Sequence, residues 1–221
     1  MNRNIIVYPS FTLCSIVAES AEMVPNATPD MLYRVELPYH NGNINVMRKK
    51  GYLFADRTIG VMINLRRNNI DYQKMLRFDI RRAKDERDDI LRISRNSFTQ
   101  DSRFHVRPAN DDDQAYEIIA DYVENLSEAY VCLYKEQVVG FLDLEQCEEN
   151  SCFIHLAAVQ EKYRVAGVAV SLYAKAVLIA KERGCEKVYG RISSGNVAVM
   201  NLYAYLGATF FDPKDVFVRD E

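Results

Sequence analysis

The chain has 221 residues, 48% of them hydrophobic, which is enough to bury the core of one large domain or of two small ones. Its 28 Lys and Arg residues are offset by 31 Asp and Glu residues, and this net charge of −3 argues against nucleic acid as a partner. No segment approaches the roughly 18 unbroken apolar residues of a transmembrane helix, so no membrane partner is expected.

The cysteines and the N-terminal stretch both indicate a cytoplasmic protein. The five cysteines are odd in number and contain no C-x-x-C pair, which is typical of free thiols in a reducing compartment, and no metal site is expected. The apolar stretch 5–18 follows Arg3 as in a signal peptide. However, Pro9 and Thr12 interrupt it, and Glu19 follows where small neutral residues are expected. It is interpreted as strand material.

The pattern changes near residue 76, which predicts a small N-terminal domain, residues 1–75, and a larger domain, residues 76–221. Before this boundary the sequence is irregular and dotted with Asn and Pro. After it, residues 76–80 alternate between apolar and polar as in a half-buried strand, and Asp85 is the expected N-cap of the next helix.

The later elements predict a mixed sheet with helices on both faces, which is an α/β fold. Hairpin turns between the early strands imply antiparallel neighbours, and the later strand-helix-strand units imply parallel ones. The expected elements are helices 86–98 and 111–126, strands 129–134, 138–145 and 151–159, helix 167–183, strand 187–192, helix 196–206, and two strands near 209–211 and 215–219.

The end of the N-terminal region resembles the end of the chain. In both places a helix ends at a glycine, Gly51 or Gly207, and an aromatic strand follows. Counting back four residues from each glycine sets Met47 opposite Tyr203. Two interpretations stay open: a degenerate half that kept its scaffold and lost its phenol, or a common junction that arose twice by chance. No glycine-rich loop precedes Met47, so the chemistry is expected in the C-terminal part.

The most informative stretch joins the buried strand 153–159 to helix 167–183 through small residues. The unpaired N–H groups at the start of that helix lie at the positive end of its dipole and suit an anion such as a phosphate. Gly167 and Ala169 have almost no side chain to hold the anion away, and Arg164 adds a cationic fork. The sequence therefore predicts an anion site at this junction.

This R-x-x-G-x-A pattern after a strand resembles the acetyl-CoA pyrophosphate loop of the GNAT acyltransferases. The strand and acidic cap near Asp85 resemble the opening of a GNAT domain, and residues 1–75 resemble a truncated second copy. Ala166 and Ala169 depart from the glycines or other small residues common there. The resemblance implies a GNAT fold, acetyl-CoA as cofactor, and a cofactor site formed by Ala157, Ala158, Val159, Arg164, Val165, Ala166, Gly167, Val168, Ala169, Asn196 and Tyr203.

Asn196 and Tyr203 lie seven residues apart on one predicted helix, about 20° from the same line along its face. In GNAT enzymes an asparagine and a tyrosine in this pattern before L-G-A bind the cofactor and protonate the coenzyme A thiolate, respectively. A phenol with a pKa of about 10 is a suitable acid for a thiolate whose thiol has a pKa of about 8.5. Tyr203 is thus the expected general acid, and packing beside Tyr205 is the structural alternative.

Acyl transfer also requires a polarised carbonyl. A backbone N–H near Val159, at the end of strand 153–159, is the expected oxyanion donor. The resemblance implies a splay between this strand and strand 187–192 that admits the cofactor. Gly190 is consistent with a weakened strand there, although a glycine in a strand is also a routine bulge.

The sequence leaves the general base open. Asp143 and Glu145 share one face of a strand, His155 lies in the cofactor strand, and His105 lies in an earlier loop. Each also has a structural interpretation: exposed hairpin carboxylates for Asp143 and Glu145, a hydrogen-bonded core histidine for His155, and a surface loop residue for His105. Cys152 is not expected to act as a nucleophile, because direct attack by an amine needs no acyl-enzyme.

The loop D-S-R-F-H at residues 101–105 resembles the acceptor-side loop of two-domain GNAT enzymes of surface-polysaccharide synthesis, the TDP-fucosamine N-acetyltransferases. This resemblance implies a nucleotide-linked amino sugar as the acceptor. Arg103 would pair with the diphosphate, Phe104 would stack on a ring, and His105 would complete the contacts. A core role for the same residues is the alternative.

Other functions also stay open. The acceptor of a GNAT enzyme can be a protein N-terminus, an amino acid or a polyamine, and acidic walls at 111–113, Asp143 and Glu145 would favour a polyamine. A CoA-binding module without turnover is a different class, and Tyr203 argues against it. The acyl group, acetyl or longer, is open. The resemblance implies a homodimer, which no apolar stripe in the sequence requires.

Overall fold

The computed structural model describes residues 1–28, 31–99, 101–105, 112–147 and 150–219. The first elements are β1 (Asn2–Val7), β2 (Thr12–Val17), the short 3₁₀ helix η1 (Ala21–Met23), β3 (Leu32–Pro38), α1 (Asn43–Lys49), β4 (Tyr52–Asn64) and η2 (Tyr72–Met75). They are followed by β5 (Asp79–Arg82), α2 (Arg87–Ser97), α3 (Asp112–Glu124), β6 (Ala129–Tyr134), β7 (Gln137–Cys147), β8 (Ser151–Val159), η3 (Glu161–Ala166), α4 (Val168–Glu182), β9 (Lys187–Ser193), α5 (Val197–Tyr205) and β10 (Thr209–Arg219).

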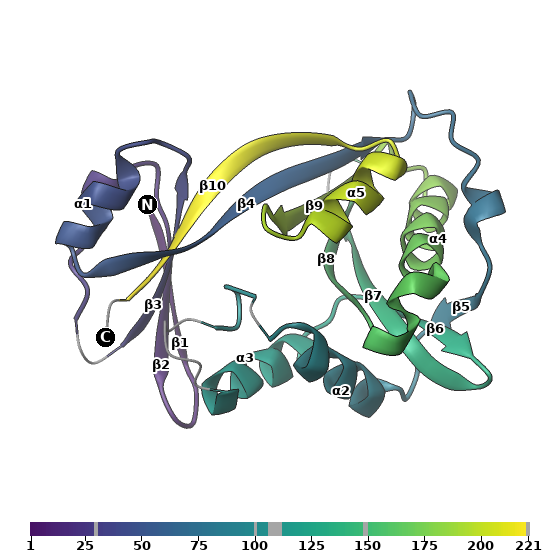
Figure 1. The fold of residues 1–221 in the computed structure, drawn as a ribbon, viewed down its shortest axis with the longest axis horizontal. Coiled ribbons are helices and arrows are strands. Elements are labelled where there is room, and N and C mark those ends of the chain that lie inside the picture. Colours follow the sequence, from purple (N-terminus) through teal and green to yellow (C-terminus); the bar gives the residue numbers. More distant parts are fainter. Residues whose placement is uncertain (29–30, 100, 106–111, 148–149, 220–221) are drawn as a thin grey trace.

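Across the described ranges the strands form one ten-stranded sheet, in the order β1-β2-β3-β10-β4-β9-β8-β7-β6-β5. Residues of α4 and α5 pack on one face of its C-terminal part, and residues of α2 and α3 pack on the other (Figure 1). The predicted mixed α/β fold is confirmed. No helix in these ranges is both long and apolar enough to cross a membrane.

Most elements lie close to their predicted bounds, but three expectations are wrong. The strand expected at residues 76–80 is β5, which starts only at Asp79, because Leu76 ends the preceding 3₁₀ helix η2. The N-cap of α2 is Glu86 and not Asp85. The Glu86 carboxylate accepts a 2.7 Å hydrogen bond from the N–H of Lys84 and pairs with Arg81. The two strands expected near the C-terminus are one strand, β10, because Asp212, with φ 47°, lies in a bulge that bends the strand without ending it.

β4 and β10 lie side by side as one long arch that joins two halves of the molecule (Figure 1). We call β1–β3 with α1 the N-terminal half, and β5–β9 with α2–α5 the C-terminal half. Leu53 pairs with Val218 at one end of this ladder, and Thr209 pairs with Met62 at the other. The strands β1-β2-β3-β10 repeat the arrangement of β7-β8-β9-β4, since both series pair antiparallel, parallel and antiparallel. In both series the last strand comes from the other half of the molecule, so β4 and β10 are exchanged between the halves.

The N-terminal half differs from the C-terminal half where the phenol would stand. Met47 and Tyr203 are both buried, at 0% and 1% exposure. The register of the ladders places Val35 of β3 where the other half has Gly190 of β9. Val35 and Met47 belong to one apolar cluster, so a valine and a methionine fill the space that a glycine and a tyrosine share elsewhere.

In the N-terminal half, the segment after β2 presents backbone carbonyl oxygens, whereas an anion site would need N–H donors. Its β2 and β3 stay paired as far as Val17 and Glu36. In the segment after β2, the ammonium of Lys50 is bonded to three backbone carbonyl oxygens, those of Ala21, Glu22 and Val24, at 2.9, 2.8 and 2.5 Å. Carbonyl oxygens repel a phosphate, so this half offers no anion site there.

We predict that Asp215→Ala lowers the free energy of unfolding by about 2–3 kcal/mol, because it strands buried donors. Asp215, at 0% exposure in β10, accepts hydrogen bonds from Arg57 Nε at 2.9 Å and from Asn43 Nδ2 at 3.3 Å. Asp212→Ala in the same strand removes a 43% exposed carboxylate and is expected to cost less than about 1 kcal/mol. Urea unfolding measures both, and equal losses would contradict the prediction.

Candidate active site

β8 and β9 begin as parallel neighbours and then separate. Their pairing ends at Ile154 and Gly190. Beyond that point β8 stays paired with β7 as far as Val159, and β9 stays paired with β4 as far as Ser193. The expected splay between these strands is therefore present, and we call it the wedge.

A β-bulge at His155 accompanies the separation. The residues on either side of His155 pair with adjacent residues of β7, so His155 itself has no partner in that ladder. The extra residue reverses the alternation of the strand. Ile154 packs under α4, Ala158 packs on the opposite face, and Ala157 and Val159 lie on the α4 side. Among the predicted cofactor residues of β8, only Ala157 and Val159 thus face α4 with their side chains.

Tyr203 lies where the two strands part. Its hydroxyl would be only 2.5 Å from a Cβ at position 190, so glycine is required there. The ring meets Tyr173 of α4 edge-on, with centroids 5.2 Å apart. Burial raises the pKa of Tyr203 well above its usual range, the neighbouring Tyr173 raises it further, and the charge of Arg103 opposes both. Tyr203 therefore keeps its proton at neutral and mildly alkaline pH.

The predicted phosphate loop leads from β8 through η3 into α4. Gly167 has φ 83°, and a Cβ built on it would meet nothing within 4 Å. Val165 is 96% exposed, and Arg164 donates from Nε to the carbonyl oxygen of Val159 at 3.3 Å. The loop thus leaves open space before the N–H groups of the first turn of α4.

Asn196 is the N-cap of α5, where its side-chain oxygen accepts a 3.1 Å hydrogen bond from the N–H of Val199. The expectation that its side chain shares a helix face with Tyr203 is wrong, because the N-cap precedes the first helical turn. Its side-chain amide nitrogen takes no part in this capping bond. A cofactor contact by Asn196 would use that nitrogen.

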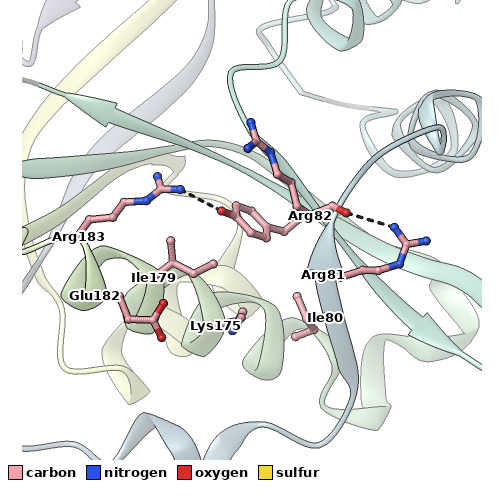
Figure 2. A pocket seen from close by; sticks show the side chains of 8 residues that line it. Ile80, Arg81, Arg82, Lys175, Ile179, Glu182 and Arg183 are labelled. Carbon is pink, nitrogen blue, oxygen red and sulfur yellow. Dashed lines mark hydrogen bonds between the residues drawn. The ribbon is translucent and has the colours of Figure 1, made fainter.

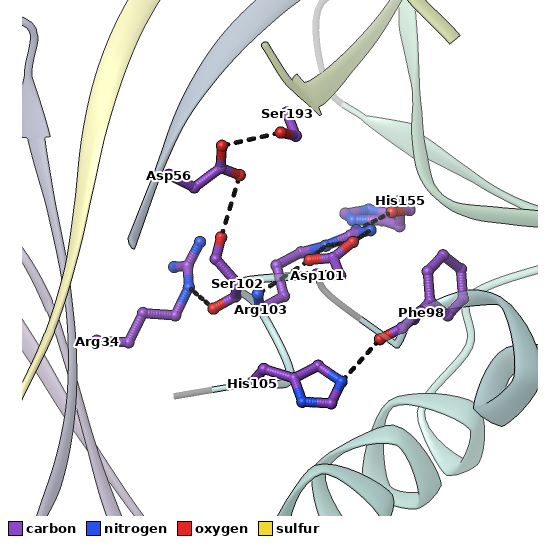
Figure 3. Close-up of polar contacts among 9 residues, drawn as sticks. All are labelled: Arg34, Asp56, Phe98, Asp101, Ser102, Arg103, His105, His155 and Ser193. Carbon is purple, nitrogen blue, oxygen red and sulfur yellow. Dashed lines mark hydrogen bonds and ion pairs between the residues drawn. The ribbon is translucent and has the colours of Figure 1, made fainter. Parts of the chain in front are cut away.

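Arg103 lies between the acceptor-side loop and the bulge. It is bonded to Asp101, with Nη2 2.6 Å from Oδ2, and Nη1 donates to the carbonyl oxygen of His155 at 2.8 Å (Figure 3). Burial disfavours the charge of Arg103, but the Asp101 carboxylate outweighs it and raises the pKa of the guanidinium. The loop is therefore attached to the strand at the residue where the wedge opens.

The stacking role expected for Phe104 is wrong. Phe104 is 1% exposed, and its ring packs between Phe98 and Tyr122, with centroids 5.3 Å from each. A ring held in this core has no face to offer an acceptor. His105 is also engaged, with Nε2 2.9 Å from the carbonyl oxygen of Phe98 (Figure 3).

The structure separates the candidates for the base. Asp143 is 2% exposed and accepts a 2.8 Å hydrogen bond from the N–H of Glu128, which gives it a structural role. Glu145 and His155 form a pair, Oε2 to Nε2 at 2.5 Å, with side chains 46% and 35% exposed. The side chains of residues 111–112 lie outside the described residues. His155 with Glu145 is therefore the accessible acid-base pair at the bulge.

Two polar residues at this site, Asp56 and Ser193, were missed in the sequence, whereas their neighbour Ser102 belongs to the loop 101–105 singled out there. Asp56 of β4 accepts hydrogen bonds from Ser193 Oγ at 2.8 Å and from Ser102 Oγ at 3.3 Å (Figure 3). Asp56 and Ser193 are 137 residues apart, and they meet only because β4 pairs with β9. No local motif signals such a contact.

A separate cavity of about 380 Å³ lies between α4 and the strands β5 and β6, at the β5 edge of the sheet (Figure 2). Its lining is rich in basic side chains, but Arg81 pairs with Glu86, and Arg183 pairs with Glu128. It contains none of the predicted site residues. Searching the described part of the chain also finds no group of three or more metal-ligating side chains.

The sequence was compared with models of known protein families and with curated proteins. Residues 88–208 match the family model described as the acetyltransferase (GNAT) family. A search of curated proteins gave no match.

Solved structures share the fold at low identity. A functionally unknown conserved protein from Staphylococcus epidermidis has a TM-score of 0.63 at 14% identity, covering 86% of this chain and 73% of its own. A GCN5-related N-acetyltransferase from Kribbella flavida has 0.62 at 12%, covering 99% and 90%. A fungal multi-domain GH3 β-N-acetylglucosaminidase, with a region described as a GCN5-related glucosamine N-acetyltransferase, has 0.64 at 12%, covering 98% and 31%.

We predict that Gly190→Ala destabilises the fold by about 1–3 kcal/mol, because the added methyl group would clash with the Tyr203 hydroxyl. The same substitution in the Tyr203→Phe background is expected to cost less, since the nearest atoms are then Val61 Cγ2 at 3.2 Å and the ring carbon of residue 203 at 3.4 Å. Urea unfolding of the four proteins measures the difference. An identical cost in both backgrounds would show that the hydroxyl does not lie on Gly190.

Proposed function

Because its residues 88–208 match the family model, the chain belongs to the acetyltransferase (GNAT) family, and we propose that it is an acetyl-CoA-dependent N-acetyltransferase. The observation that carries this proposal is the wedge between β8 and β9 with Tyr203 at its start. An open strand edge offers backbone groups to an extended ligand arm, and a protonated phenol lies beside it. Both are needed to transfer an acyl group from a thioester to an amine.

The residues around the wedge fit a coenzyme A thioester. Gly167 leaves open space before the first turn of α4, where N–H groups suit a diphosphate, and Arg164 lies at the rim. Ala157 and Val159 flank the arm on the α4 side, and the N–H groups of β8 beyond the bulge are the donors we propose for the thioester oxygen. When bound, acetyl-CoA supplies the activated acetyl group.

Tyr203 is the general acid in this proposal. Its raised pKa keeps a proton on Oη until a thiolate is present to take it. The base is His155, oriented by Glu145, because this pair is accessible where the bulge opens the strand edge. In this proposal the proton donor and the proton acceptor act from opposite faces of the sheet, with the thioester between them.

For the acceptor we propose an amino sugar, in the nucleotide-linked form that the likeness of loop 101–105 favours. The fungal structure whose region is described as a glucosamine N-acetyltransferase supports a sugar amine, since the match, at 12% identity, covers 98% of this chain. Arg103 is the residue of the loop that lies at the wedge. The deciding experiment measures thiol release from acetyl-CoA with TDP- and UDP-amino sugars, glucosamine, amino acids, peptides and polyamines. Reaction with a peptide or polyamine, but with no sugar, would contradict the sugar assignment.

We predict that Tyr203→Phe lowers kcat by about ten- to a thousandfold while the Kd for acetyl-CoA changes little, because the ring stays packed and only the proton is lost. Tyr205→Phe on the same helix, where the side chain is 60% exposed, is the matched control and is expected to leave kcat unchanged. Steady-state kinetics and calorimetry give the two quantities. Wild-type turnover in Tyr203→Phe would remove the proposed acid.

We predict that Gly167→Glu abolishes acetyl-CoA binding measured by calorimetry, because it places a carboxylate where a diphosphate is expected. Gly184→Glu is the matched control. This glycine follows the other end of α4, also has a positive φ, 74°, and also has nothing within 4 Å of a built Cβ. Both substitutions carry similar backbone strain, so only the first is expected to affect binding. Unchanged affinity in Gly167→Glu would refute the loop assignment.

A further inference from the structure

The strands β3, β10, β4 and β9, together with the loop at residues 101–105, carry a row of polar side chains on the face of the sheet opposite α4 and α5. Most charges in this row are balanced by a neighbour. Arg34 pairs with Glu36, Arg191 pairs with Asp212, and Arg103 pairs with Asp101.

Asp56 is the exception in this row. Its carboxylate accepts three hydrogen bonds, from the N–H of Arg57 at 2.7 Å and from the hydroxyls of Ser193 and Ser102. Among the described residues, no Lys, Arg or His nitrogen lies within 4.0 Å of it. The side chain of Arg57 points to the other face and binds Asp215. Within the described part of the chain, Asp56 is thus a half-buried carboxylate that is held in place by neutral donors and is not paired with a cation.

The carboxylate of Asp56 is partly shielded from water. Burial raises the pKa of Asp56, and the hydrogen bonds from Ser193, Arg57 and Ser102 only partly offset this effect. An ammonium group beside Asp56 would compensate its charge, which neutral hydroxyls cannot do.

Asp56 also lies next to the wedge. Ser193, its hydrogen-bond partner, ends β9, three residues after Gly190, where β8 and β9 part. Ser102, its other partner, is adjacent in sequence to Arg103, which binds the carbonyl oxygen of His155 at the bulge (Figure 3). A single short loop therefore connects Asp56 to the strand edge at which an acyl group would be presented.

We propose that Asp56 is the acceptor subsite, supplied by the N-terminal half, and that it binds an ammonium group of the acceptor. The inference rests on the proposed function where it calls the bound amine an acyl acceptor. The binding of an ammonium group by Asp56 does not depend on that function. Ser193 and Ser102 fix the carboxylate, and the site selects a cationic amine over a neutral alcohol of the same shape. The exchanged strand β4 thus gives the N-terminal half a part in substrate choice, although that half has no anion site of its own.

The test is calorimetric titration of the full chain, saturated with CoA, with two matched pairs of probes at pH 7: glucosamine and glucose, and putrescine and 1,4-butanediol. We expect the wild-type protein to bind at least one amine about tenfold or more tightly than its alcohol counterpart. Asp56→Asn, whose amide oxygen still accepts from Ser193 and from the Arg57 N–H, is expected to remove this preference.

Asp212→Asn is the matched control, because Asp212 lies in the same row and is already paired with Arg191. It is expected to keep the amine preference within about threefold. Unchanged amine affinity in Asp56→Asn would overturn the proposal. So would a wild-type protein that does not distinguish amine from alcohol in either pair, a result that needs no variant to fold.

Thiol release is measured in parallel, so the two proposals fail separately. Amine selectivity that depends on Asp56, without thiol release from acetyl-CoA, would leave the subsite standing and remove the acyl transfer. Thiol release with an amine whose affinity is unchanged by Asp56→Asn would support the acyl transfer and overturn the subsite.

Discussion

The antiparallel pairing of β4 with β10 is the contact on which the rest of the structure depends. Each strand starts in one half of the molecule and ends in the other, so the ladder joins both halves into one sheet. It also keeps backbone groups of β9 hydrogen-bonded where the wedge opens. Because β4 stays paired with β9 up to Ser193, β9 can leave β8 after Gly190 while one of its edges remains satisfied. Without β4 at that edge, the same separation would expose β9 on both sides.

The two halves of the molecule differ at the positions that line the candidate site. In the C-terminal half, a bulge at His155 parts the strands, and Gly190 admits the hydroxyl of Tyr203. In the N-terminal half the strands stay paired, Val35 and Met47 close the corresponding space, and carbonyl oxygens surround Lys50. The changes are mutually consistent, since a tyrosine needs the glycine and an anion needs N–H donors. The N-terminal half keeps a different role, because its strand β4 carries Asp56 to the wedge.

Local patterns predicted the elements of the C-terminal part well. The run 151–159 and the amphipathic stretch after Gly167 are long and periodic, and both were placed within a residue of their observed bounds. The C-terminal strand was misread, because a bulge at Asp212 looks like a turn in the sequence. Phe104 was misread for a related reason. An aromatic residue in a polar loop has the same composition whether its ring faces solvent or, as here, a core formed with Phe98 and Tyr122.

The sequence by itself determined the mixed α/β class, the loop at Gly167 and the choice of Tyr203 as the residue of interest, because each depends on neighbours within one strand-turn-helix unit or one helix. The tertiary structure decided what those residues face. The exchange of β4 and β10, the meeting of Asp56 with Ser193, and the contact of Tyr203 with Gly190 all join segments that are far apart in the chain or in different elements. The sequence of a strand does not specify which other strand it will pair with. These contacts therefore follow only from the assembled sheet.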